Sequence, residues 1–150
     1  MDFTTTIEIA SDARTIWEAV SNPQNWANWM PEVKDVEPTK PGTTPGYGAE
    51  YTVKQPWWKL DTQQIQIRDF EPERRLAYAA STSSGEIAFE YAMRELADRR
   101  FAVDFTMRSV GGYAKLTAAL SGGAMERRLV KEAEELRDYC EARSPQDVVG

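Results

Sequence analysis

The 150-residue sequence contains no histidine and a single cysteine, Cys140. Without histidine the chain lacks the commonest general base and metal ligand, and it cannot form a Ser-His or Cys-His nucleophile pair. One cysteine excludes an internal disulfide, and its place in a helical pattern indicates a buried or half-buried thiol rather than a nucleophile. Any chemistry must therefore use carboxylates, Tyr, Lys, Arg or positioned water, and we expect no metal and no cofactor.

Long apolar runs and large clusters of positive charge are also missing. No stretch approaches the ~18 consecutive apolar residues of a membrane-spanning helix, and the start of the chain lacks the basic and apolar regions of a secretion signal. The net charge of −6 disfavours nucleic acid and anionic lipid surfaces as partners. The basic pairs Arg99-Arg100 and Arg127-Arg128 stand among acidic residues and indicate solvated faces. We expect a cytoplasmic protein with no nucleic-acid partner and no stable membrane insertion; the oligomeric state stays open.

The N-terminal segment predicts one strand and two short helices. Residues 3–9 alternate apolar and polar side chains, as in a half-buried strand. Ser11 is the expected N-cap of a helix that ends near Asn22. Asn22-Pro23 predicts a second helix start, because Asn caps well and Pro is favoured at the first helical position. The apolar positions of this second helix are Trp26, Trp29 and Met30.

Strands dominate the middle of the chain. Alternating apolar residues separated by short Pro-, Gly-, Ser- or Asp-containing turns predict strands over residues 33–37, 47–55, 60–70, 76–80, 87–93 and 101–107. Successive strands with such short connections favour an antiparallel meander. We expect an α+β fold with a curved antiparallel sheet of about six to seven strands, formed by one domain over residues 1–150.

A long helix is predicted from Tyr113 to about Arg143, where the apolar period changes to that of a helix. Gly122-Gly123 interrupts the pattern and predicts a kink or a close backbone approach. The apolar face is expected at Leu129, Ala133, Leu136 and Cys140. The opposite, exposed face is expected at Glu126, Lys131, Glu134, Glu135 and Asp138.

Three segments resemble the polyketide cyclase/dehydrase and lipid-transport group of the START-related helix-grip (SRPBCC) superfamily. They are IEIASDARTIWEAVSNPQNWANWMPEV, DFEPERRLAY and ERRLVKEAEELRDYCEA. Asp98-Arg99-Arg100 replaces the family's usual Gly-Thr turn before the penultimate strand, which is a structural departure. The resemblance implies a helix-grip fold, in which the sheet wraps the final helix and leaves a cavity for a hydrophobic ligand.

The residues expected to line this cavity are mainly aromatic, apolar or amide side chains on the inner face of the sheet, as in many ligand clefts. They are Trp29, Tyr51, Gln55, Trp57, Gln63, Ile65, Ile67, Tyr78, Phe89, Tyr91, Phe105, Met107, Leu116 and Leu120. Core packing is the plainer interpretation of each tryptophan. Tyrosine hydroxyls are candidate hydrogen-bond donors to a ligand carbonyl.

Catalytic residues do not stand out. Ring closure of a poly-β-ketone needs a base and donors that stabilise an enolate. Asp61, Glu90 and Asp104 are the candidate carboxylates, but Glu90 and Asp104 alternate onto the outer face, so no catalytic residue is assigned.

Three functions therefore stay open. The first is binding or transport of a hydrophobic small molecule such as a lipid, isoprenoid or polyketide. The second is a polyketide aromatase/cyclase that uses Tyr and carboxylate groups and contains a buried carboxylate of raised pKa. The third is a protein-interaction module, which a cavity too small for any ligand beside an exposed apolar patch would favour.

Overall fold

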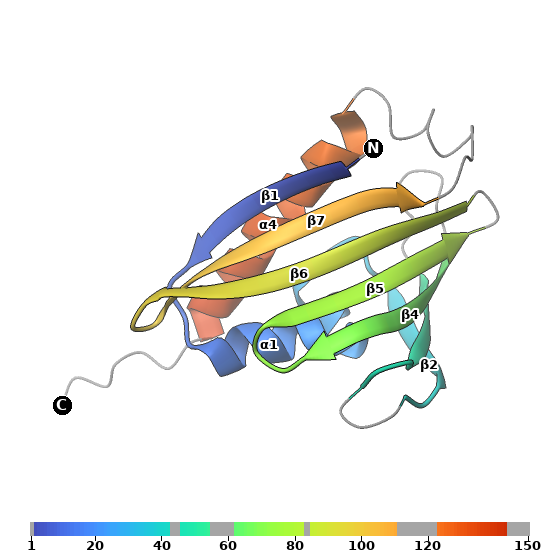
Figure 1. Ribbon diagram of the computed structural model, residues 1–150, viewed down its shortest axis with the longest axis horizontal. Helices are drawn as coiled ribbons and strands as arrows, with labels where there is room; N and C mark the ends of the chain where they lie inside the picture. Colours follow the sequence, from blue (N-terminus) through green and yellow to red (C-terminus); the bar gives the residue numbers. More distant parts are fainter. Residues whose placement is uncertain (1, 43–45, 55–61, 83–84, 111–122, 144–150) are drawn as a thin grey trace.

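A computed structural model, which describes residues 2–42, 46–54, 62–82, 85–110 and 123–143, shows a seven-stranded antiparallel sheet in the order β1-β7-β6-β5-β4-β3-β2 (Figure 1). The first strand thus pairs with the last one, and each of the others pairs with its neighbours in the chain. The strands are β1 (Asp2–Ile9), β2 (Asp35–Lys40), β3 (Glu50–Lys54), β4 (Thr62–Glu71), β5 (Arg75–Thr82), β6 (Gly85–Ala97) and β7 (Arg100–Val110). The helices are α1 (Ala13–Ser21), the 3₁₀ turn η1 (Pro23–Asn25), α2 (Trp26–Trp29) and α4 (Ala124–Arg143).

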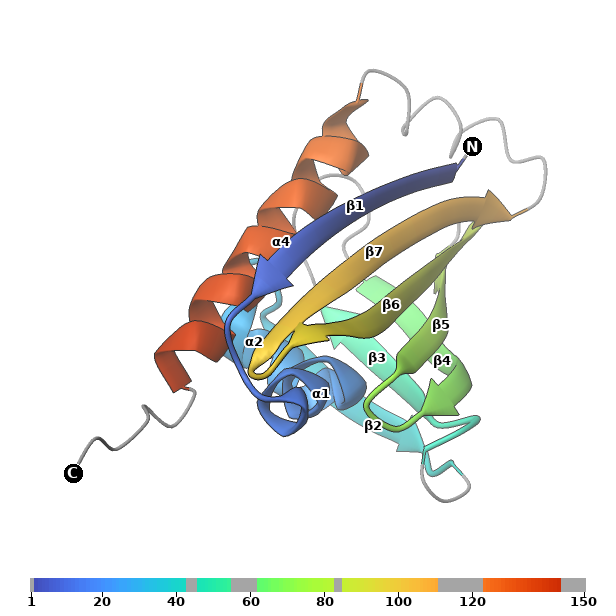
Figure 2. The same ribbon diagram turned by 60° about the vertical axis from the view of Figure 1, so that its left-hand side comes forward.

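The sheet is curved, and the helices lie on its concave side. Figure 2 shows the sheet bending around α4, with α1 and α2 closing one end. The helix-grip architecture predicted from the sequence is therefore confirmed. None of the described helices is both long and apolar enough to cross a membrane.

Two helix starts follow from local capping. The α1 helix begins one residue later than predicted, because Asp12 rather than Ser11 is the N-cap and accepts the Thr15 N–H at 3.2 Å. Ser11 is instead fully buried. The predicted Asn22-Pro23 start is confirmed, since the Asn22 side chain accepts the Gln24 N–H at 3.0 Å.

The C-terminal helix is described from Ala124, directly after Gly123. Gly123 has a φ of +76°, in the left-handed region that an α-helix cannot continue through. The apolar face of α4 is the predicted one, and Leu129, Leu136 and Cys140 are buried. Burial raises the pKa of the Cys140 thiol to about 12, so the thiol stays protonated at neutral pH. The predicted helix over residues 113–122 lies outside the described residues.

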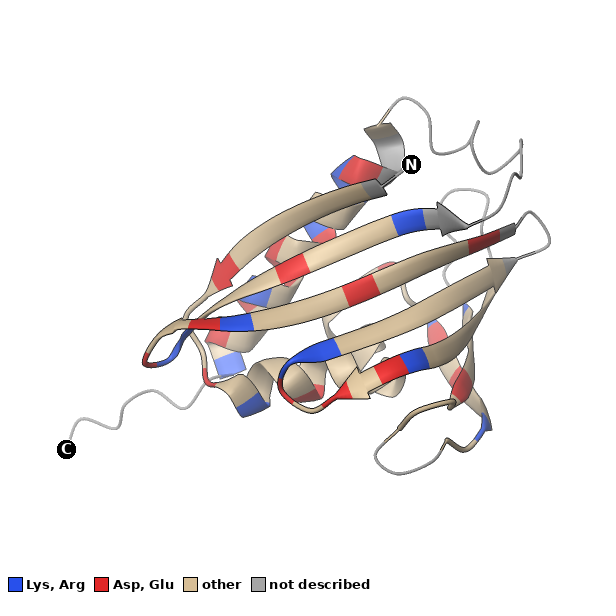
Figure 3. Cartoon of the chain, in the orientation of Figure 1, with Lys and Arg blue, Asp and Glu red and all other residues tan. Residues whose placement is uncertain are grey.

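Alternation along the strands separates an apolar inner face from a charged outer face. Figure 3 shows acidic and basic residues spread over the outer side of the sheet. Asp104 lies there, hydrogen-bonded to Arg94 at 3.2 Å, and so does Glu90, which contacts Arg75 at 3.1 Å. The predicted outward direction of both carboxylates is confirmed.

Two hairpin turns place a non-glycine residue in the left-handed region. Glu73 has a φ of 60° in the turn between β4 and β5, where the Arg74 N–H donates to the Glu71 carbonyl at 2.9 Å. This matches a type II turn with Pro72 at the second position and Glu73 at the third, which favours glycine. Arg99 has a φ of 55° in the turn between β6 and β7. This turn, predicted before the penultimate strand, therefore precedes the last described strand.

Replacing Glu73 by glycine is expected to raise the free energy of unfolding by about 0.5–1 kcal/mol. The left-handed conformation costs an L-residue about 1–2 kcal/mol, and glycine removes this cost. Glycine also gives the unfolded chain more entropy, which lowers the free energy of unfolding by about 0.4–1 kcal/mol and offsets part of the stabilisation. Urea unfolding measures the difference. Glu73→Ala is the matched control, because it removes the same charge but keeps the Cβ; equal stabilisation by both variants would contradict the backbone explanation.

Candidate functional site

The inner face of the sheet carries a cluster of aromatic rings opposite α2 and α4. The Tyr78 ring stacks on Phe89 with centroids 5.1 Å apart and lies 4.9 Å from the Trp26 ring. Tyr91 packs edge-on against Phe105 at 4.9 Å. Tyr78, Tyr91 and Phe105 are almost fully buried. Strand register brings them together, because Tyr78 pairs with Phe89 and Tyr91 pairs with Phe105 on neighbouring strands.

One carboxylate, that of Glu132 on α4, lies within this aromatic interior. Glu132 is only 8% exposed, and the Tyr91 hydroxyl donates to its Oε2 across 3.5 Å, a long hydrogen bond. The Tyr91 and Tyr78 hydroxyls are 3.3 Å apart. Three polar groups therefore form a chain from Glu132 through Tyr91 to Tyr78 inside an otherwise apolar region.

The environment of Glu132 disfavours its charge. Burial raises the pKa of the Glu132 carboxyl to about 7, with Glu135 and Glu32 adding to the increase and the Arg128 guanidinium opposing it. Burial and the negative charge of Glu132 likewise hold the pKa of Tyr91 well above its usual value. Near neutral pH, Glu132 can therefore both accept and donate a proton, whereas the tyrosines stay protonated donors.

A second group of charges surrounds Glu132 on the helix. Arg128 contacts Glu32 at 2.8 Å and Glu135 at 3.0 Å, and its side chain is only 9% exposed. The prediction of a solvated Arg128 is therefore wrong, and so is the prediction of an exposed Glu135, whose side chain is 15% exposed. Both errors have the same cause: Glu32, just after α2, reaches across to α4 and covers this part of the helix.

The predicted cavity residues divide into three groups. Tyr78, Phe89, Tyr91 and Phe105 meet in the cluster beside Glu132. Other predicted residues are buried elsewhere on the inner side, namely Trp29, Gln63, Ile65, Ile67 and Met107, while Tyr51 is half-buried. Four lie outside the described residues: Gln55, Trp57, Leu116 and Leu120. The candidate carboxylate Asp61 also lies outside them.

The tryptophans near the cluster have a packing function. The indole N–H groups of Trp26 and Trp29 donate to the α1 carbonyls of Val20 and Ala19, each at 3.0 Å. These bonds attach α2 to α1 and hold Trp26 against Tyr78. Core packing therefore accounts for the positions of Trp26 and Trp29.

Sequence reasoning missed Glu132, although a signal was present. Glu132 is three residues after Leu129 and four before Leu136, so it shares the buried face of the helix with them. A carboxylate on an apolar stripe indicates either a paired core group or a functional one.

The described residues offer little support for the other kinds of site. No group of three acidic or cysteine side chains in this part of the chain could hold a metal ion. Its exposed large apolar side chains lie apart in the chain: Tyr47 in the connection between β2 and β3, Leu96 on β6 and Val130 on α4.

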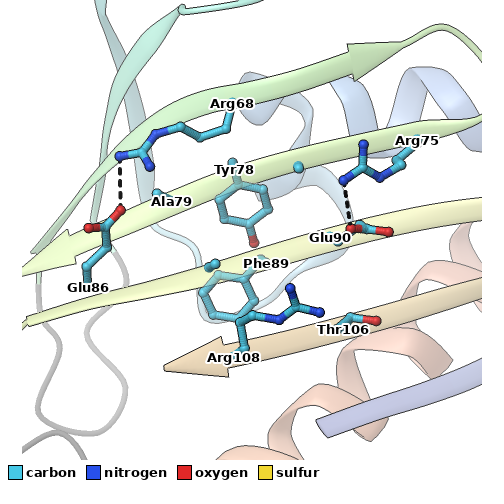
Figure 4. A pocket seen from close by; sticks show the side chains of 11 residues that line it. Arg68, Arg75, Tyr78, Ala79, Glu86, Phe89, Glu90, Thr106 and Arg108 are labelled. Carbon is cyan, nitrogen blue, oxygen red and sulfur yellow. Dashed lines mark hydrogen bonds and ion pairs between the residues drawn. The ribbon is translucent and has the colours of Figure 1, made fainter. Parts of the chain in front are cut away.

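A shallow depression of about 220 Å³ lies on the outer face of the sheet. Figure 4 shows its rim, where Arg68 contacts Glu86 at 2.9 Å and Arg75 contacts Glu90 at 3.1 Å. Because a carboxylate already neutralises Arg68 and Arg75, these two guanidiniums offer little free charge to an anion.

The fold and this interior correspond to a known class. The polyketide cyclase/dehydrase and lipid transport family matches residues 1–141. The chain belongs to this family, in agreement with the resemblance seen in the three sequence segments. No curated protein sequence matches it.

Solved structures with the same fold have diverse descriptions. The Zhui aromatase/cyclase from Streptomyces sp. R1128 superposes with a TM-score of 0.78 at 19% identity, covering 95% of this chain and 94% of that one. The di-domain aromatase/cyclase StfQ of the steffimycin biosynthetic pathway gives a TM-score of 0.66 at 20% identity, covering 93% of this chain and 44% of that one. Aha1 from Colwellia psychrerythraea, described as a dimer, superposes with a TM-score of 0.67 at 10% identity, covering 94% of this chain and 96% of that one. At these identities the similarity shows the fold alone.

Proposed function

We propose that the chain, as one domain, binds a hydrophobic small molecule of the polyketide or lipid class between the sheet and α4, with Tyr91 and Glu132 as its polar anchor. The observation that carries the proposal is the buried Glu132 carboxyl, which accepts a hydrogen bond from Tyr91 beside the aromatic cluster. Apolar surroundings with a few convergent polar groups are typical of small-molecule sites. Membership of the polyketide cyclase/dehydrase and lipid transport family supports the same class of ligand. A single, buried cysteine suits the cytoplasmic location that we also propose.

The chemistry of the anchor narrows the ligand. Protonated Tyr78 and Tyr91 supply hydroxyl donors, and Glu132 supplies an acceptor when charged or a donor when protonated. A ligand with carbonyl or phenol groups on an apolar frame could form further hydrogen bonds with these groups, whereas a pure hydrocarbon would gain none from them.

Emodin, a hydroxylated anthraquinone, is a suitable probe for this site. We expect it to quench tryptophan emission, because Trp26 lies against Tyr78. Tyr91→Phe should weaken binding about 3–10-fold, which corresponds to one lost hydrogen bond. The exposed Glu134→Gln is the control and should bind like the wild type. Unchanged emission with emodin, together with no lipid in native mass spectra of the purified protein, would reject the proposal.

A second candidate function is catalysis of polyketide ring closure, which the raised pKa of Glu132 favours. A carboxylate with a pKa of about 7 is well matched to removing an α-proton at neutral pH. The Tyr91 and Tyr78 hydroxyls would then stabilise the enolate oxygen.

Deuterium exchange at the α-carbon of 1-phenylbutane-1,3-dione separates the two functions. If the chain is a catalyst, Glu132→Gln should keep probe binding within a few-fold but reduce exchange to the rate in buffer. Equal exchange rates for wild type and variant would leave binding as the function.

A further inference from the structure

A second depression lies between the end of α1 and the inner face of β3 and β4, with a volume of about 310 Å³. It is separate from Glu132, although one of its walls, Ile67, pairs with Tyr78 on the neighbouring strand. Its lining combines short polar side chains with aromatic and aliphatic ones: Ser21, Asn22, Gln24, Gly46, Tyr51, Ile67 and Phe70.

None of these lining residues carries a charge, in a chain of which 28% of residues are charged. These described residues therefore supply no ionic attraction for a phosphate or a carboxylate, and the net charge of −6 opposes anions further. A cation would find no carboxylate among the seven described lining residues either. The electrostatics favour a neutral ligand.

The polar side of the depression offers both donors and acceptors. The Asn22 side-chain oxygen accepts the Gln24 N–H at 3.0 Å, which fixes the Asn22 carboxamide in place. Within the described part of the chain, the Gln24 carboxamide and the Tyr51 hydroxyl take part in no hydrogen bond. Amide and hydroxyl groups of this kind pair well with ligand hydroxyls, which donate and accept at once.

The apolar side is held rigidly. The Phe70 ring packs edge-on against Trp17 with centroids 5.2 Å apart. The Gly46 backbone also approaches this ring so closely that a Cβ there would lie 2.7 Å from it. The wall is therefore preformed, which lowers the entropy lost on binding.

From this combination we infer that the depression binds a neutral polyhydroxylated ring, such as a hexose. Its volume equals that of about ten waters at ~30 Å³ each, enough for one such ring. Hydroxyls would pair with Gln24 and Tyr51, and the C–H face of the ring would lie on the apolar wall. The inference goes beyond the proposed function and does not depend on ligand binding at Glu132.

Titration of the ¹⁵N-labelled chain with methyl β-D-glucopyranoside, followed by amide chemical shifts, tests the inference. We expect saturable shifts at the amides of Ser21, Asn22, Gln24 and Tyr51. Gln24→Ala and Tyr51→Phe should each weaken the fitted Kd about threefold or more, which corresponds to one lost hydrogen bond. Gln64→Ala is the matched control, since Gln64 is an exposed residue on the opposite face of β4 and should leave the Kd unchanged.

Octyl β-D-glucopyranoside, used below its micelle concentration, distinguishes two sources of the sugar. If octyl glucoside binds at least tenfold more tightly than the methyl glycoside and shifts the same residues, the ligand is a sugar that carries a hydrophobic group. If the two glycosides bind with similar affinities, the ligand is a free sugar. No saturable shifts at the amides of Ser21, Asn22, Gln24 and Tyr51 with either probe, or a Kd that neither variant changes, would overturn the inference.

Discussion

Replacing Phe105 by alanine is expected to lower the free energy of unfolding by about 3–5 kcal/mol, the usual effect of removing a buried phenylalanine ring. Phe105 is fully buried at the centre of β7, and its ring supports Tyr91 at a centroid distance of 4.9 Å. Since a domain of ordinary stability unfolds at a cost of about 5–15 kcal/mol, the variant should be close to the limit of folding. Urea denaturation followed by tryptophan emission measures the change.

Phe3→Ala is the matched control for this variant. Phe3 lies on the same inner face, but it is only partly buried and belongs to the edge strand β1. The loss of stability there should be less than half of that at Phe105, because surrounding water partly replaces the lost contacts. Equal losses at both positions would contradict the central position assigned to Phe105.

The sheet and its terminal helix could be predicted because their signals are repetitive. Residues 101–107 alternate along most of β7, and the apolar spacing of Leu129, Ala133 and Leu136 is typical of a helix. Boundaries were less certain, since they depend on single side chains: whether Ser11 or Asp12 caps α1 is decided by which oxygen reaches the Thr15 N–H.

The candidate site was only partly predictable. Strand parity placed Tyr78 and Tyr91 on the inner face, where the structure also has them. The sequence could not show that Glu32 would reach Arg128, because that contact joins segments about a hundred residues apart and depends on how α4 crosses the sheet. Without this contact, Arg128 and Glu135 have the pattern of an ordinary exposed helix face.

The stability of the protein is expected to depend on pH through Glu132. The pKa of this carboxyl is about 7 in the folded chain, against 4.5 for an ordinary glutamate. Because the folded pKa is raised, the contribution of Glu132 to stability is fully present below pH ~4.5 and is lost as the pH rises through about 7. The raised pKa corresponds to a total loss of about 3 kcal/mol.

Comparison with Glu132→Gln isolates this contribution from that of the other acids. The amide has nearly the same shape as the carboxyl and does not titrate, so the stability of the variant relative to the wild type should increase by about 2–3 kcal/mol between pH 5 and pH 8. Arg128, which contacts Glu32 and Glu135, stays charged over this range, and its attraction limits the size of the effect. The exposed Glu134→Gln should instead follow the wild-type curve at both pH values. If the free energies of unfolding of Glu132→Gln and of the wild type change in parallel from pH 5 to pH 8, Glu132 is charged throughout this range. It could then anchor a ligand as a hydrogen-bond acceptor but could not exchange protons with one near neutral pH.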